Sequence, residues 1–160
     1  MRLPDGLVIR RMAADDVDAV LELERGSEGA PHWTRAEYLA CLEAAGDSAL
    51  RRFGFVALAD GVLAGFAVVR RVAALGESEA ELESIVVVAA LRGRGIGAGL
   101  VAVSMDLARV EGAGRLDLEV RASNLAAIRL YARAGLVEIG RRRGYYRSPE
   151  DDAVLMQVKL

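Results

Sequence analysis

Glycines alternate with other residues between Arg92 and Gly99, directly after an apolar run that is typical of a strand. Glycine allows successive backbone N–H groups to converge on one anion, because no Cβ stands in the way. The residues that follow have the pattern of an amphipathic helix, whose free N-terminal N–H groups add positive potential. Two arginines add charge. The segment therefore predicts a pyrophosphate site, made of Arg92, Gly93, Arg94, Gly95, Ile96, Gly97 and Ala98.

The same segment fits two other interpretations. Gly97, Gly99 and Ala102 have the G-x-G-x-x-A spacing of dinucleotide-binding proteins, and Asp117 follows at a suitable distance. That spacing falls inside the predicted helix, and the chain has too few α/β repeats for a doubly wound sheet. A Walker-type phosphate loop is excluded, because no lysine follows the glycines. A glycine-rich helix entry without any ligand is the second alternative.

A basic and aromatic segment lies near the C-terminus. It consists of Arg141, Arg142, Arg143, Gly144, Tyr145, Tyr146 and Arg147. Such a run usually forms a solvated face. Tyrosines among arginines also permit stacking on nucleic acid bases. The net charge of -2 gives no support for a nucleic acid partner, so we expect none.

Seven strands and four helices are predicted around these segments. The strands are expected at 7–12, 53–59, 62–70, 81–88, 116–120, 136–142 and 153–160. The helices are expected from Ala14, from Arg35, from the glycine-rich turn to about Val110, and over 125–134. Asp60-Gly61 predicts a hairpin, and Thr34 with Glu37 predicts a capping box. The order of elements indicates a mixed α/β fold.

Composition limits the classes of protein that the chain can represent. A length of 160 residues suits one domain over 1–160, and no apolar run approaches the ~20 residues of a membrane-spanning helix. The N-terminus has no signal-peptide pattern, so we expect a cytoplasmic protein away from the membrane. Cys41 and His32 are each the single residue of their type. A cysteine zinc cluster or a multi-histidine site is therefore excluded, and we expect no metal.

Longer segments resemble a known family. ESIVVV followed by RGRGIGAG resembles the acetyl-CoA pyrophosphate motif of GNAT acetyltransferases. LEVRASNLAAIRLYARAGL, RRRGYY and EDDAVLMQVKL are similar to the bacterial ribosomal-protein-alanine N-acetyltransferases, the RimI type. PHWTRAEY resembles their Pro-Trp-Ser/Thr segment, although His32 separates the two residues here. The resemblance implies a central mixed, mostly antiparallel sheet of about seven strands flanked by about four helices, with acetyl-CoA as the acetyl donor.

The resemblance also assigns individual roles by position. Glu119 matches the general base, and Tyr131 matches the general acid that returns a proton to the leaving thiolate. Asn124 is expected to contact the cofactor, and Arg92 to Ala98 to hold its pyrophosphate. The pantetheine arm would be lined by Ile85, Val86 and Val87. A backbone N–H near Val87 would hold the thioester oxygen, where the strand is expected to bulge away from its neighbour.

Each assigned side chain also has a purely structural interpretation. Glu119 would be a solvated carboxylate at a strand end, and Tyr131, three residues after Ile128, would belong to the core. Asn124 would serve as a helix N-cap.

Glu83 is an alternative base and a candidate substrate contact, because many GNAT enzymes use an acid on this strand. Side chains alternate along a strand, so Glu83 is expected to share a face with Ile85. Acidic residues from Glu77 to Glu83 would favour a cationic acceptor. The resemblance places Tyr145 and Tyr146 over the acceptor site, where they would form a wall for the substrate.

The acceptor implied by the resemblance is a protein N-terminus, first of all that of a small-subunit ribosomal protein. An α-amine has a pKa of about 7.7–8.0 against about 10.4 for lysine, so its deprotonation is cheaper by roughly 3.4 kcal/mol. Two alternatives remain, a small-molecule amine as acceptor and a regulator that binds acyl-CoA without catalysis. Either a monomer or a dimer is compatible with the sequence.

Overall fold

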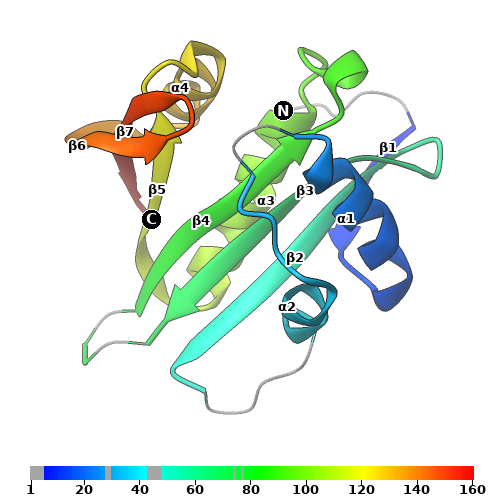
Figure 1. The fold of residues 1–160 in the computed structure, drawn as a ribbon. Coiled ribbons are helices and arrows are strands. Elements are labelled where there is room, and N and C mark those ends of the chain that lie inside the picture. The colour runs from blue at the N-terminus through cyan, green and yellow to red at the C-terminus, as the bar shows by residue number, and fades with distance from the viewer. Residues whose placement is uncertain (1–5, 28–29, 43–47, 74, 77) are drawn as a thin grey trace.

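The computed structural model describes residues 6–27, 30–42, 48–73, 75–76 and 78–160. In these residues seven strands form one sheet in the order β1-β2-β3-β4-β5-β7-β6 (Figure 1). The strands are β1 (Leu7–Arg11), β2 (Leu50–Ala59), β3 (Val62–Val72), β4 (Ser78–Val87), β5 (Ala113–Arg121), β6 (Val137–Arg147) and β7 (Glu150–Lys159). The helices are α1 (Val17–Arg25), α2 (Arg35–Ala40), α3 (Ile96–Val110) and α4 (Leu125–Arg133). Only β4 and β5 pair in parallel, so the predicted mixed, mostly antiparallel sheet is confirmed.

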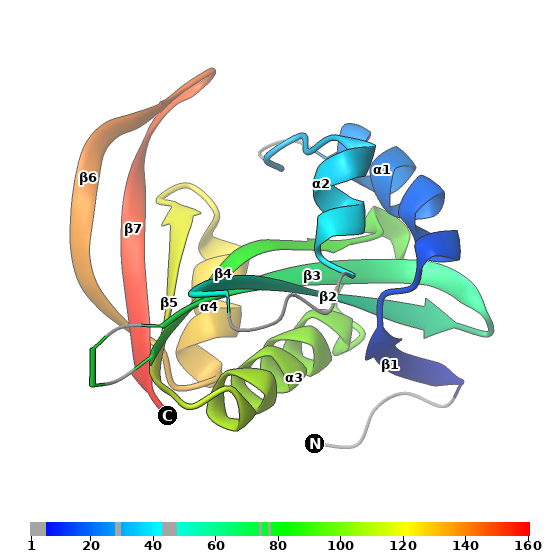
Figure 2. The same ribbon diagram turned by 90° about the horizontal axis from the view of Figure 1, so that it is seen from below.

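Helices cover both faces of the sheet. Figure 2 shows α1 and α2 on one face and α3 and α4 on the other. Two hydrophobic clusters result, one under each pair of helices. The capping box before α2 is present, because Thr34 N–H donates to the Glu37 carboxylate at 2.6 Å and Glu37 N–H donates to Thr34 Oγ1 at 3.3 Å. None of the helices among the described residues has the length and apolar character needed to cross a membrane.

The last two strands are longer than the sequence predicts. β6 continues to Arg147 instead of ending at Arg142, and β7 begins at Glu150 instead of Ala153. A register shift between Arg142 and Tyr146 accommodates Gly144, whose φ is +56°. Its N–H donates to Asp152 Oδ1 at 2.9 Å. The sequence pattern does not predict the additional residues of β6, because this strand has no regularly buried face.

A β-bulge in β4 overturns one prediction about Glu83. Val69 pairs with Leu82 and Val68 pairs with Ser84, so Glu83 has no partner on β3. The extra residue reverses the alternation of side chains. Leu82 and Ile85 therefore both face α3, whereas Glu83 lies on the opposite face from Ile85. The expectation that these two residues share a face was wrong.

The bulge also lies elsewhere than predicted. It occurs at Glu83, whereas near Val87 the strand keeps its register with Gly65 on β3. At Val87, β4 is nevertheless separated from β5, because the hydrogen-bonded pairing of these strands ends at Glu81 and Asp117. Beyond that pair the two strands diverge (Figure 1).

Gly65 allows β3 to approach β4 closely beside this gap. A Cβ at Gly65 would lie 2.6 Å from Val86 O and 3.3 Å from Val87 Cα, both of them backbone atoms. We expect Gly65→Ala to lower the free energy of unfolding by about 1–3 kcal/mol, because the strands must move apart. Urea denaturation measures the effect.

Gly140→Ala on β6 is the matched control, because no atom lies within 4 Å of a Cβ built there. We expect its effect to stay within about 0.5 kcal/mol. Equal stability of the two variants would contradict the close approach at Gly65.

Candidate functional site

The glycine-rich turn connects β4 to α3 and has the geometry expected of an anion site. Gly93 has φ +77° and Gly95, the N-cap of α3, has φ +83°. Glycine adopts such angles without steric cost, and most other residues adopt them rarely. No atom lies within 4 Å of a Cβ built at either position, so the space in front of the turn is open. Free N–H groups of the first turn of α3 complete a cradle that fits a phosphate.

The other residues predicted for this site differ in what they can offer. The Ile96 side chain is buried in the core, so only its backbone is available. A Cβ at Gly97 would lie 3.1 Å from Leu130 Cδ2, so this glycine lets α3 and α4 pack closely. Arg92 and Arg94 are exposed, and Ala98 is half-buried. The dinucleotide spacing, by contrast, lies inside α3 with its middle glycine, Gly99, buried.

The free edge of β4 faces the gap between β4 and β5. Val88 N–H donates to Ala64 O on the β3 side at 2.9 Å, so the N–H of the preceding residue, Val87, points away from β3. Arg92 Nε donates to Val87 O at 3.2 Å from that outer side. The side chains of Ile85 and Val87 pack against the α3 core, and Val86 is buried in the other core.

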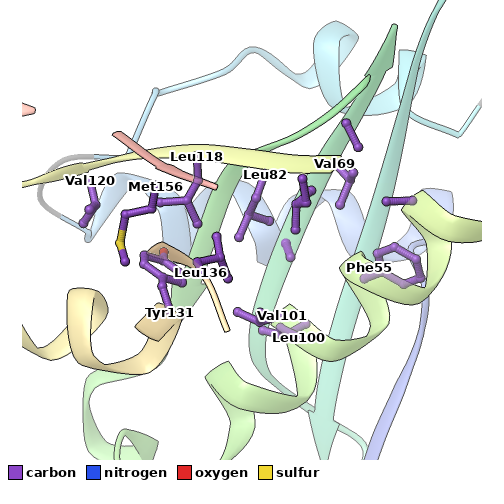
Figure 3. Packing of buried hydrophobic residues seen from close by; sticks show 14 of the residues in the cluster. Phe55, Val69, Leu82, Leu100, Val101, Leu118, Val120, Tyr131, Leu136 and Met156 are labelled. Atoms are coloured by element: carbon purple, nitrogen blue, oxygen red, sulfur yellow. The ribbon is translucent and has the colours of Figure 1, made fainter. Parts of the chain in front are cut away.

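Glu119 and Tyr131 lie on opposite faces of β5, near the end where β4 has diverged. Leu118 and Val120 are buried with Tyr131, so the intervening Glu119 points to the other face. Figure 3 shows the Tyr131 ring beside Leu136 and Met156. Tyr131 is 5% exposed, and burial raises its pKa above the ordinary value, with a smaller contribution from the Tyr146 hydroxyl.

The Tyr146 hydroxyl lies close enough to interact electrostatically with both Tyr131 and Glu119. Burial raises its pKa, and the nearby Glu119 carboxylate raises it further. Its ring contacts that of Tyr145, with centroids 5.2 Å apart at 86°. The guanidinium of Arg121 lies 4.1 Å from the Tyr146 centroid. The predicted tyrosine pair is thus brought close to the predicted base.

Arg142 is a member of this group that the sequence does not single out. Its Nη1 lies 2.9 Å from Glu119 Oε1, and its guanidinium lies 5.4 Å from the Tyr145 centroid. In the sequence it is the middle one of three arginines, a pattern typical of a solvated face. Only the register of β6, β7 and β5 distinguishes Arg142 from its neighbours.

Glu83 has a different set of partners, which are two arginines. Arg52 donates to both of its carboxylate oxygens, at 2.7 and 3.1 Å, and Arg70 Nε lies 3.3 Å from Oε1. Arg52 in turn lies over the Trp33 ring at 5.4 Å. Both oxygens are therefore occupied by cations. Glu77, the first of the predicted acidic residues, lies outside the described residues.

Asn124 has the structural role that the sequence left open. Its Oδ1 accepts from Ala127 N–H at 3.1 Å as the N-cap of α4. The side-chain amide nitrogen remains the part of Asn124 that can reach a ligand.

Comparisons with known proteins support the resemblance. The acetyltransferase (GNAT) family model matches residues 17–136. The [ribosomal protein bS18]-alanine N-acetyltransferase of Escherichia coli is 30% identical over 154 residues, which cover 95% of this chain and 97% of that protein. The N-alpha-acetyltransferase RimI of Mycobacterium tuberculosis is 40% identical over 97 residues, covering 61% and 60% of the two chains.

The crystal structure of the ribosomal-protein-S18-alanine N-acetyltransferase from Escherichia coli superposes with a TM-score of 0.76 at 30% identity. It covers 96% of this chain and 93% of that one. The fold, the family model and the relatives all indicate the same family. The chain belongs to the acetyltransferase (GNAT) family and is an acyltransferase.

Proposed function

We propose that the chain transfers the acetyl group of acetyl-CoA to the α-amine of a protein N-terminus. The observation that carries the proposal is the placement of Glu119 and Tyr131 on opposite faces of β5, beside the gap between β4 and β5. A base on one face and an acid on the other match the two proton transfers of the reaction.

The residues present fit acetyl-CoA. The open cradle at Gly93 and Gly95 suits the pyrophosphate, and the outward N–H of Val87 suits an amide or carbonyl oxygen. When bound, acetyl-CoA supplies a thioester carbonyl that is activated towards an amine. In the proposal, Val87 N–H donates to that carbonyl oxygen.

Glu119 is the proposed base. Its carboxylate lies on the face that carries α1 and α2, and its side chain is 25% exposed. An α-amine loses its proton near neutral pH, so one carboxylate, acting directly or through water, is sufficient. Glu83 is the less suitable base, because two guanidinium groups hold its oxygens.

Tyr131 is the proposed acid. A tyrosine phenol is protonated at neutral pH, and burial raises the pKa of Tyr131 further, so in the proposal its proton passes to the sulfur in concert with cleavage of the C–S bond. Its position on α4 is on the side of the sheet where Ile85 and Val87 pack. This position supports the proposed role of Tyr131, which is to return a proton to the leaving sulfur.

The acceptor is the finer part of the proposal. The relatives of similar length are named for alanine acetylation on ribosomal protein bS18, which makes the N-terminus of that protein the first acceptor to test. Tyr145 and Tyr146 are rigid aromatic walls beside Glu119, suited to a small first residue such as alanine.

Gly95 tests the phosphate cradle. We expect acetyl-CoA at one hundred times its dissociation constant to stabilise the protein by about 2.7 kcal/mol in a thermal-shift assay. Gly95→Asp should remove this stabilisation, because a negative charge would stand where phosphate binds. Gly95→Asn is the matched control of nearly the same size, and both residues tolerate a positive φ. Equal stabilisation of the Asp and Asn variants would contradict the cradle.

The proposed acid and base are tested by steady-state turnover. Glu119→Gln and Tyr131→Phe should each lower kcat by roughly 10²-fold, the usual scale for a positioned acid or base. Both variants should still gain thermal stability from acetyl-CoA, because neither side chain lies in the phosphate cradle. Near-normal turnover of Glu119→Gln, together with loss of turnover in Glu83→Gln, would transfer the role to Glu83.

The acceptor atom is tested with paired peptides. Each peptide begins with alanine and contains one internal lysine, and the α-amine is either free or blocked. We expect mass spectrometry to find acetylation only at the free α-amine, because the lysine amine is charged at neutral pH. Equal acetylation of both peptides, or a preference for free spermidine, would contradict the proposal.

A further inference from the structure

We infer that Arg142 is a positioning residue that orients the Glu119 carboxylate for proton transfer. This inference rests on the proposed function, in which Glu119 is the base. It starts from the ion pair between Arg142 Nη1 and Glu119 Oε1, which are 2.9 Å apart.

The ion pair spans three strands. Arg142 on β6 pairs with Ala153 on β7, which pairs with Arg121 on β5, two residues from Glu119. Directly paired residues share a face of the sheet, so Arg142, Arg121 and Glu119 all lie on one face. Strands are about 4.8 Å apart, so the Arg142 side chain must cross β7 to reach β5. Ala153 is fully buried, and its single methyl group leaves room for that crossing.

Arg142 does not hold the Glu119 carboxylate through a pair of hydrogen bonds. Arg142 Nη1 lies 2.9 Å from Oε1, and no hydrogen bond to the Glu119 carboxylate is found within the part of the chain that the structure describes. The ion pair restricts rotation of the carboxylate, and its oxygens can still accept a hydrogen bond from an amine or a water molecule. This differs from Glu83, whose two oxygens are both bound by Arg52.

The pair is too exposed to contribute much to folding. The Arg142 side chain is 52% exposed, and ion pairs of this kind contribute little to stability. A loss of turnover in an Arg142 variant would therefore not be explained by unfolding.

Arg142 is itself held by the aromatic pair. Its guanidinium lies 5.4 Å from the Tyr145 centroid, within the range of a cation–π contact. Tyr145 packs edge to face on Tyr146, and the bulge that carries both is fixed by the bond from Gly144 N–H to Asp152. The proposed substrate wall, Tyr145 and Tyr146, and the cation that orients the base, Arg142, thus lie together on β6.

A double-mutant cycle on an alanine-starting peptide tests the inference. Turnover is measured for the parent chain, Arg142→Gln, Glu119→Gln and the double variant. We expect Arg142→Gln to lower kcat roughly tenfold, within the coupling range of residues in one ion pair, with the KM for acetyl-CoA unchanged. In the Glu119→Gln background the same substitution should have almost no further effect, because no carboxylate remains to be oriented.

Two further variants distinguish a specific role of the Arg142 side chain from a general effect of surface charge. Arg142→Lys keeps the cation and should recover most of the turnover. Arg143→Gln is the matched control, because Arg143 is the exposed neighbour and forms no ion pair among the described residues. It should have parental kcat, although it loses the same charge.

Other outcomes overturn the inference. An equal loss from Arg142→Gln in both backgrounds, or an increase in kcat, would show that Arg142 does not act through Glu119 in this way. An Arg143→Gln loss as large as that of Arg142→Gln would assign the effect to surface charge. If Glu119→Gln itself keeps near-parental turnover, the proposed base fails and the inference fails with it, so the two failures are distinguishable.

Discussion

The short parallel pairing of β4 and β5 is the constraint on which the site depends. Among the described residues, hydrogen bonding joins the two strands from Ser78 to Glu81, opposite Ala113 to Asp117. Beyond that point the backbone of β4 has a strand partner on one side only. A fully paired sheet would leave no outward N–H at Val87. The β-bulge at Glu83 lies two residues beyond Glu81, the last residue paired with β5, where β4 leaves β5 while keeping its hydrogen bonds to β3.

Several ion pairs lie around the segment in which β4 and β5 are still paired. Arg70 lies against Glu81 and Glu83, and Arg115 lies 2.7 Å from Glu79 and 2.9 Å from Asp117. Glu79 and Asp117 stand on β4 and β5, so Arg115 connects the two strands where they are still paired. Partly exposed pairs of this kind contribute modestly one by one, and more when they form a network. Glu83, which the sequence suggests as a base, belongs to this network.

Local features of the fold were predictable, and features that depend on register across strands were not. The glycine-rich turn, the Thr34 cap and the Asp60-Gly61 hairpin are each specified within a few residues. The face of Glu83 depends on a bulge that strand alternation does not reveal. Arg142 acquires its partner only through the pairing of β6 with β7 and of β7 with β5. The catalytic roles of Glu119 and Tyr131 were predicted from a family resemblance, because a carboxylate and a phenol at those positions also have ordinary structural interpretations.

The position of β6 at the edge of the sheet has a consequence for solubility. An edge strand presents unpaired backbone groups to any other extended chain, and proteins with long flat edges tend to aggregate. β6 carries four arginines, and the bulge at Gly144 interrupts its regular hydrogen-bonding edge. A second copy that approached this edge would meet like charges and an irregular backbone. The strand that carries Arg142 and the two tyrosines therefore also discourages strand-by-strand association of the protein with itself.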